Sequence, residues 1–260
     1  MLEIIYIMLN RIKNLTIAVA IIIILFESLY SLWINRSNIL SKFNTYTGTS
    51  FSSNTSSNLE WAQKVMKGGY IIHVRHAERQ KWIDVEMYDS LESDVHENGV
   101  NQSRMAEFDY FKDAVCLNSR GHIQARAIGE HLNNINFPTG YVISTPSCRG
   151  RQTAELSFGG YDELNRDLVH RGPYLQAEED HANDLKELYF NLPILEETNT
   201  IVSAHNSVVH PAMFESSFLL DEDYKLEEGG FYIISKTETG LVMEYKFHNF
   251  GDFIRLFYER

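Results

Sequence analysis

Apolar and polar positions recur with two different periods along the chain and predict a series of strands and helices. Short apolar runs typical of buried strands lie at 70–74, 140–145 and 199–204, and helical patterns lie at 59–69, 119–135 (with Ser119 as the N-cap), 148–158, 180–192 and 210–220. The pattern at 230–247, turned at 238–240, predicts a β-hairpin. Because strands alternate with helices, we expect an α/β fold with a mainly parallel sheet flanked by helices on both faces.

A strongly apolar segment near the start of the chain has a different character. Residues 15–34 contain a single charge, Glu27, and have the length that crosses the hydrocarbon core of a bilayer. Arg11 and Lys13 precede the segment and favour a cytoplasmic N-terminus. We therefore expect a transmembrane helix within an anchor at 1–36, with the rest of the chain outside the cytoplasm. A cleaved signal peptide and a buried core helix are alternative interpretations.

Two further segments show no apolar period. Residues 37–58 are rich in Ser, Thr and Asn, which is typical of a flexible linker to a domain at 59–260. Residues 80–116 are irregular, polar and aromatic. Because a stretch of this length inside a compact domain is usually a functional loop, we expect an insertion that influences the choice of substrate.

Charge and composition narrow the classes of partner. The formal net charge is -12 and no basic stripe is present, which argues against a nucleic-acid-binding protein. Hydrophobic residues make up 44% of the chain, enough for a well-formed core. An anionic ligand would have to be attracted by a local group of cations and not by the field of the whole protein. Nothing in the pattern indicates an oligomeric state.

Cationic or cation-forming side chains follow each of the three predicted strands. Arg75 and His76 end the first strand, Arg149 begins the helix after the second, and His205 ends the third. In such sheets ligands bind at the carboxyl ends of the strands. Each residue alone is typical of a structural or solvated position, but four at one edge repel one another unless an anion lies between them. Guanidinium groups bind phosphate oxygens, and a neutral imidazole can attack phosphorus.

Motifs for other chemistries are missing from the sequence. The His, Asp and Glu residues show no clustered metal-ligand spacing, and there is no Walker, dinucleotide-binding or nucleophile-elbow motif. We therefore expect neither a metal ion nor a cofactor at this edge of the sheet.

Four segments occur along the chain in a fixed order. They are "RHAER" at 75–79, "LNSRGHIQARAIGEHL" at 117–132, "VISTPSCRGRQTAE" at 142–155 and "TIVSAHNSVV" at 200–209. The series resembles the histidine phosphatase superfamily, and "RHAER" is similar to its Arg-His-Gly/Ala-Glu signature. The resemblance covers residues 68 to about 235. It implies the phosphoglycerate mutase-like fold.

The resemblance also implies roles for the residues at the strand ends. His76 would be the nucleophile that forms a covalent phosphohistidine, and Arg75, Arg149 and His205 would form the phosphate pocket. For His76 to present a neutral nitrogen to phosphorus, its other ring nitrogen should donate to a backbone carbonyl.

The general acid that protonates the leaving oxygen is less well defined by the resemblance. The segment "YLQAEEDHANDL" places carboxylates at the head of a predicted helix, and Glu179 and Asp180 are the predicted catalytic acids. Glu178 is a further candidate, as are Asp84 and Glu86 of the loop. Because carboxylates at a helix start also cap the helix and interact with its dipole, a purely structural role for the cluster stays open.

These inferences favour a phosphomonoester hydrolase whose substrate is a small phosphorylated metabolite or an envelope sugar phosphate. The N-terminal apolar segment and the "RHA" strand are similar to those of branches that include lipopolysaccharide core heptose phosphatases. Two alternatives stay open: a non-catalytic membrane-anchored phosphate-binding protein and a phosphoglycerate-type mutase. A membrane tether makes a mutase of a soluble glycolytic sugar acid the least favoured of the three.

Two cysteines complete the candidate chemistry. Cys116 precedes the "LNSRG" turn and Cys148 neighbours Arg149. If the domain lies outside the cytoplasm, a disulfide between them is chemically permitted. Two free thiols are equally compatible with the sequence.

Overall fold

The protein is described by a computed structural model over residues 55–80, 115–169, 178–215 and 225–258. By its contacts the chain divides into Met1–Thr55 and a compact unit, Ser56–Arg260. The predicted anchor at 1–36 with its span at 15–34, nearly all of the linker at 37–58 and most of the insertion at 80–116 lie outside the described residues. Within the described ranges, no helix has the length and apolar character needed to cross a membrane.

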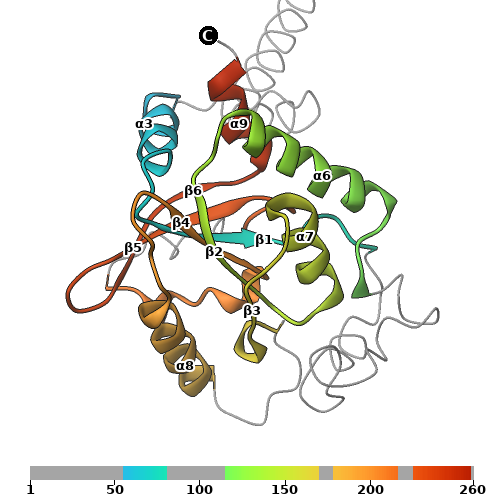
Figure 1. Ribbon diagram of the computed structural model, residues 1–260. Coiled ribbons are helices and arrows are strands. Elements are labelled where there is room, and N and C mark those ends of the chain that lie inside the picture. The colour runs from blue at the N-terminus through green and yellow to red at the C-terminus, as the bar shows by residue number, and fades with distance from the viewer. Residues whose placement is uncertain (1–54, 81–114, 170–177, 216–224, 259–260) are drawn as a thin grey trace, which may run out of the picture. The chain divides into compact units, whose positions relative to one another are not determined.

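Among the described residues a six-stranded sheet runs in the order β3-β2-β4-β1-β5-β6 (Figure 1). The strands are β1 (Ile71–Arg75), β2 (Thr139–Ser144), β3 (Glu163–Leu164), β4 (Asn199–Ala204), β5 (Phe231–Lys236) and β6 (Leu241–Phe247). The pairs β3-β2, β2-β4 and β4-β1 are parallel, whereas β5 is antiparallel to both β1 and β6. The sheet is therefore mixed, and the predicted hairpin forms its antiparallel part.

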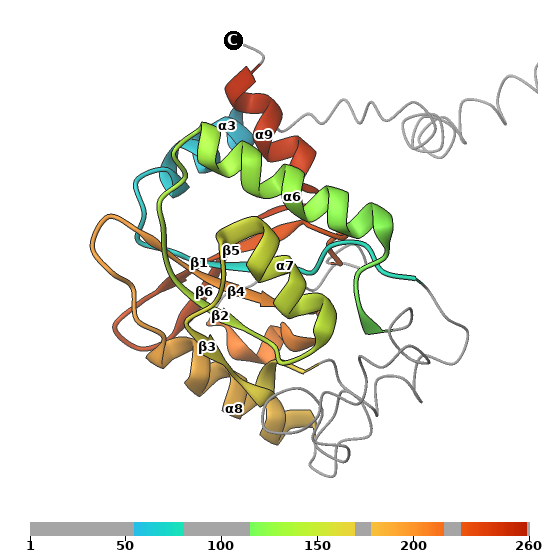
Figure 2. The same ribbon diagram turned by 45° about the vertical axis from the view of Figure 1, so that its right-hand side comes forward.

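Helices cover both faces of the sheet, as predicted. They are α3 (Thr55–Val65), α6 (Ser119–Asn134), α7 (Cys148–Phe158), α8 (Glu178–Asn191) and α9 (Phe250–Tyr258), with short 3-10 turns at Arg166–Leu168, Asn206–Val208 and Pro211–Met213. Figures 1 and 2 show α8 on one face and α3, α6, α7 and α9 on the other.

The central strand β1 explains why two layers pack on this sheet. Ile71 belongs to the core cluster that contains Leu185 of α8, whereas Ile72 and Val74 belong to the cluster that contains Ile128 of α6. Successive side chains of a strand point to opposite faces, so the apolar residues of this buried strand serve two cores. The carboxyl end of β1 is thereby fixed in the middle of the sheet.

The segment after β1 passes close to the start of α6. The N-cap of this helix is Asn118 and not the predicted Ser119, because the Oδ1 atom of Asn118 accepts a hydrogen bond from the Gly121 N–H at 2.7 Å. A Cβ atom at Gly121 would lie only 1.9 Å from the carbonyl oxygen of Glu78. Glycine is therefore required for this close approach of the two backbones.

Several elements differ from the sequence prediction, which missed the short strand β3 and placed residues 55–58, the start of α3, in the linker. The predicted helix at 210–220 is wrong over its described part, where only the 3-10 turn forms and Phe214 has extended backbone angles. There the N–H of Glu215 donates to the carbonyl of Leu241 in β6 at 2.9 Å, which holds the chain in an extended path. The helix α9 was missed, although Phe253, Ile254 and Phe257 have the spacing of one helical face.

Candidate functional site

Two histidines lie side by side because their strands are neighbours. In the parallel pair β1-β4, Arg75 is opposite Ala204, so His76 and His205 are the next residues at the carboxyl ends. The N–H of His76 donates to the carbonyl oxygen of Ala204 at 3.0 Å, and the two imidazole centroids are 5.1 Å apart. Both side chains are buried. The structure thus brings these two sequence-predicted residues together at one edge of the sheet.

His76 is held neutral with one ring nitrogen left for chemistry. Its Nδ1 atom lies 2.7 Å from the carbonyl oxygen of Ala77. Because a carbonyl only accepts, Nδ1 carries the proton and Nε2 keeps its lone pair. Burial lowers the pKa of His76 well below its ordinary value, and the charge of Arg149 lowers that pKa further. The result is the form of imidazole that can attack an electrophile.

Arg149 lies in the first turn of α7, which follows β2. The hydroxyl of the N-cap residue Ser147 accepts from the Gly150 N–H at 3.4 Å, and it lies 3.3 Å from Nε2 of His205. The guanidinium of Arg149 is almost fully buried, and its Nη1 donates to the carbonyl oxygen of Val115 at 3.4 Å. A buried positive charge is therefore built in next to the paired histidines.

Arg75 is oriented by the segment that precedes β5. Its Nη2 forms an ion pair with the Oε1 atom of Glu228 at 2.8 Å, and its Nη1 donates to the carbonyl of Leu226. The Arg75 and Glu228 side chains are 22% and 18% exposed. An anion that binds Arg75 would therefore share the guanidinium with a carboxylate.

A cavity of about 310 Å³ opens at these strand ends. Its described lining consists of Arg75, His76, Arg79, His205, Asn206, Ser207 and Lys225. Three of the four predicted pocket residues thus line one cavity. Arg149 is not among the lining residues and affects His76 through its charge. None of the described lining residues is a carboxylate, so this part of the cavity wall attracts anions.

The two predicted proton donors are not part of this lining. Glu179 and Asp180 are exposed in the first turn of α8. The preceding segment, 170–177, lies outside the described residues, and so do Asp84 and Glu86 of the loop. The catalytic role of Glu179 or Asp180 stays a prediction.

His73 is a buried polar residue whose partners the sequence did not reveal. Its Nε2 donates to the carbonyl oxygen of His205 at 3.1 Å, and its Nδ1 accepts from the Tyr189 hydroxyl of α8 at 2.6 Å. Burial lowers the pKa of His73 to about 3 and raises the pKa of Tyr189 well above its ordinary value. These hydrogen bonds between neutral groups therefore connect Tyr189 of α8, through His73 of β1, to the backbone of His205.

Other lining residues were also missed by sequence reasoning. Arg79 and Asn206 lie within the quoted motifs, next to predicted residues, so proximity in sequence was the available signal. Asn206 binds both backbone groups of Leu226, with its Nδ2 donating to the carbonyl at 3.0 Å and its Oδ1 accepting from the N–H at 3.3 Å. Lys225, the residue before Leu226, also lines the cavity, and no local sequence pattern predicts this contact between distant segments.

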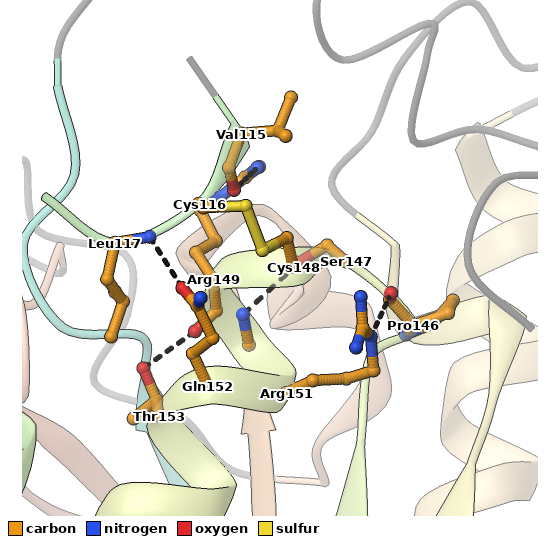
Figure 3. Close-up of a disulfide and its surroundings, with 11 residues drawn as sticks. Val115, Cys116, Leu117, Pro146, Ser147, Cys148, Arg149, Arg151, Gln152 and Thr153 are labelled. Atoms are coloured by element: carbon orange, nitrogen blue, oxygen red, sulfur yellow. Dashed lines mark hydrogen bonds between the residues drawn. A yellow bond between two sulfur atoms is a disulfide. The ribbon is translucent and has the colours of Figure 1, made fainter. Parts of the chain in front are cut away.

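The question left open for the cysteines is answered by the structure. Cys116 and Cys148 form a disulfide at the start of α7, shown in Figure 3. Among the described residues, no group of three or more His, Cys, Asp and Glu side chains is placed to hold a metal ion.

Comparison with known proteins gives a structural likeness only. No protein-family model and no curated protein sequence matches the chain. Among solved structures, phosphoserine phosphatase of Entamoeba histolytica in complex with 3-phosphoglyceric acid aligns with a TM-score of 0.44 and 13% identity, over 68% of this chain and 95% of that one. The protein histidine phosphatase SixA complexed with tungstate aligns with a TM-score of 0.41 and 11% identity, over 68% and 95%.

Phosphoglycerate mutase of Plasmodium falciparum aligns with a TM-score of 0.39 and 16% identity, over 70% of this chain and 90% of that one. All three of these proteins belong to the histidine phosphatase superfamily. At such low TM-scores we draw no function from the likeness, and the side chains described above carry the proposal that follows.

Proposed function

We propose that this chain is a phosphomonoester hydrolase of the histidine phosphatase superfamily that works through a covalent phosphohistidine on His76. The observation that carries the proposal is a neutral His76, with its Nδ1–H on a backbone carbonyl, in the lining of a cavity shared with Arg75 and His205. Burial and the surrounding cations keep the imidazole unprotonated, and the cations attract the anionic group that it attacks. The four sequence motifs support the same assignment.

In the first proposed step, Nε2 of His76 gives its lone pair to phosphorus. The bond from phosphorus to the ester oxygen breaks, and its electron pair goes to that oxygen. Arg75 and His205 bind the phosphoryl oxygens as charge builds on them, and the charge of the buried Arg149 stabilises the same oxygens. The leaving oxygen takes a proton from a carboxylic acid, for which Glu179 and Asp180 are the predicted donors.

In the second proposed step, water attacks the phosphohistidine. The water gives a proton to the carboxylate left by the first step, the bond between nitrogen and phosphorus breaks, and its electrons return to Nε2. Inorganic phosphate then leaves. The hydrogen bond from Nδ1 to the Ala77 carbonyl can persist through both steps, which keeps the orientation of the ring unchanged.

The test is to trap the intermediate. After brief incubation with an aryl phosphate, we expect mass spectrometry to find an acid-labile phosphoryl group on His76 of the wild type. His76→Ala should lose both the label and turnover while its circular dichroism stays native. His122→Ala, at a partly exposed position on α6, is the matched control. Full turnover by His76→Ala would refute the covalent mechanism.

A non-catalytic phosphate-binding protein is the second candidate, and one observation favours it. Among the described residues that line the cavity there is no carboxylate to protonate a leaving group. A binding protein would bind inorganic phosphate but would not hydrolyse alkyl phosphates, whose leaving oxygen needs a proton. Measurable turnover of an alkyl phosphate that His76→Ala abolishes would exclude it. No observation on the described residues favours a mutase.

We also propose that the domain acts outside the cytoplasm, anchored through residues 15–34, on a small phosphorylated metabolite or an envelope sugar phosphate. The Cys116–Cys148 disulfide supports this location, because disulfides persist in oxidising compartments and are rare in the cytosol. Protease added to intact spheroplasts should then digest the domain. Complete protection from protease would contradict the proposed side of the membrane.

A further inference from the structure

A disulfide joins the helix that carries Arg149 to a distant segment of the chain (Figure 3). Cys148 is the first residue of α7 and directly precedes Arg149, while Cys116 lies in the segment 115–117. Cys116 is 3% exposed and Cys148 is 4% exposed. Because exchange with external thiols requires access to the sulfur atoms, this burial favours a structural or positioning role over a redox switch.

The residues on either side of Cys116 also contact α7. The carbonyl oxygen of Val115 accepts from Nη1 of Arg149 at 3.4 Å, and the N–H of Leu117 donates to Oε1 of Gln152 at 2.8 Å. Figure 3 shows these residues next to the disulfide. One covalent bond and two hydrogen bonds thus hold the segment 115–117 against the start of α7, and the Arg149 guanidinium makes one of them.

The same turn of α7 is linked to the proposed nucleophile. The hydroxyl of Thr153 donates to the carbonyl oxygen of Arg149 at 2.8 Å and accepts from the N–H of Ala77 at 3.0 Å. The carbonyl of Ala77 in turn orients the His76 ring. The backbone of Arg149 is therefore fixed relative to His76.

The contact between Arg149 and Val115 depends on the position of the segment 115–117. A hydrogen bond of 3.4 Å lies beyond the usual range of N–H to O distances and orients a guanidinium only weakly. An arginine side chain has several rotatable bonds, and a displacement of about 1 Å can cost roughly 10²-fold in rate. Fixing the segment that contacts the guanidinium limits such a displacement, and the covalent bond at Cys116 does this.

We propose that the Cys116–Cys148 disulfide is a positioning element for Arg149. It holds the Val115 carbonyl at a fixed place relative to α7, so that the guanidinium keeps the orientation in which it stabilises the transferring phosphoryl group. This inference rests on the proposed function of His76 and Arg149. Without the disulfide Arg149 samples more rotamers, and the transition state loses more stabilisation than the bound ground state.

The test is a double-mutant cycle on the full chain, read by calorimetric titration with two probes. Orthovanadate mimics the transition state, and inorganic phosphate mimics the ground state. Cys116→Ala/Cys148→Ala should weaken vanadate binding by about tenfold and phosphate binding by less. In an Arg149→Ala background the same pair of substitutions should cause no further loss, because the group that the disulfide positions is gone.

Two controls separate positioning from general stability. Val65→Ala removes buried volume from the core on α3, away from the residues that the disulfide joins, and should leave vanadate affinity unchanged. Cys116→Val/Cys148→Ala replaces part of the lost sulfur volume and should bind vanadate as weakly as the double alanine variant. If neither cysteine variant folds, the wild type is reduced with a phosphine in urea, refolded in the presence of the phosphine and titrated instead.

Equal losses of vanadate affinity with and without Arg149 would overturn the positioning role, since the disulfide would then act on stability alone. Unchanged vanadate affinity after removal of the cysteines would also overturn it, while leaving the proposed hydrolase intact. A wild type that binds neither vanadate nor phosphate would overturn the proposed function together with this inference.

Discussion

His73 should make the folded domain sensitive to acid, and replacing it should relieve part of that sensitivity. In the fold His73 is fully buried and neutral, with a pKa lowered to about 3 by burial. In the unfolded chain the pKa of a histidine is close to about 6.5. The unfolded state therefore binds a proton over a pH range in which the folded state does not, and protons favour unfolding there.

The magnitude follows from the two pKa values. Above about pH 6.5 both states are neutral at His73, and the stability associated with its neutral form is fully present. Each pH unit below that costs about 1.4 kcal/mol until the pH nears the folded pKa. At pH 5 the loss is about 2 kcal/mol from this one side chain, a large share of the roughly 5–15 kcal/mol typical of a domain. Burial also lowers the pKa of His76, which adds a loss of the same sign.

The assay is urea denaturation of the wild type and His73→Gln at pH 7.5 and pH 5. The amide of glutamine is neutral at both pH values and can donate to the His205 carbonyl in place of the imidazole. Comparing the change in unfolding free energy between the two pH values cancels the intrinsic cost of the substitution. We expect the wild type to lose about 2 kcal/mol more than His73→Gln on acidification. His122→Gln, at a partly exposed position on α6, is the matched control.

An equal loss in the wild type and His73→Gln would refute this reasoning. It would mean that His73 accepts a proton inside the fold, and hence that the hydrogen-bonded chain through Tyr189 can rearrange around an imidazolium ion.

Two further predictions concern the start of α6 and the proton donor. Gly121→Ala should destabilise the domain by about 1–3 kcal/mol in chemical denaturation and should lower turnover, because the added Cβ would collide with the Glu78 carbonyl. Ser119→Ala, at an exposed position, is the control. Equal stability of the two variants would contradict the close approach of the two backbones. Glu179→Gln or Asp180→Asn should slow hydrolysis of alkyl phosphates far more than that of aryl phosphates with acidic leaving groups. Equal effects on both substrates, or none, would place the donor elsewhere.

The placement of His76 and His205 at one edge of the sheet was predictable, because it depends only on which residue follows each strand. His76 and His205 each follow an apolar run, and parallel strands end at the same edge of a sheet. The sequence could not show that β4 lies directly beside β1, and this adjacency is what brings the two ring centroids to 5.1 Å. The order of strands in the sheet depends on the crossover connections, and the pattern of apolar residues within each strand does not indicate that order.

Features that depend on distant partners were not predictable in the same way. The cysteines are 32 residues apart in sequence, and only the fold brings their Cα atoms to 4.8 Å, a separation that a disulfide can span. His73 looked like an ordinary member of a buried strand, because its partner Tyr189 lies on the helix packed against that face. The hydrogen bond from Glu215 to β6 likewise overrides the local helical pattern at 210–220.

The proton donor is the part of the site that a sequence pattern constrains least, for a physical reason. A carboxylate at a helix start stabilises the helix dipole whether or not it takes part in catalysis, so Glu179 and Asp180 have the right chemistry for either role. The reaction geometry supplies an independent constraint. In an in-line displacement the leaving oxygen lies across phosphorus from Nε2 of His76, so its donor must reach the side of the cavity away from that imidazole. A residue that meets this requirement affects substrates according to their leaving group, whereas a helix cap affects all of them alike.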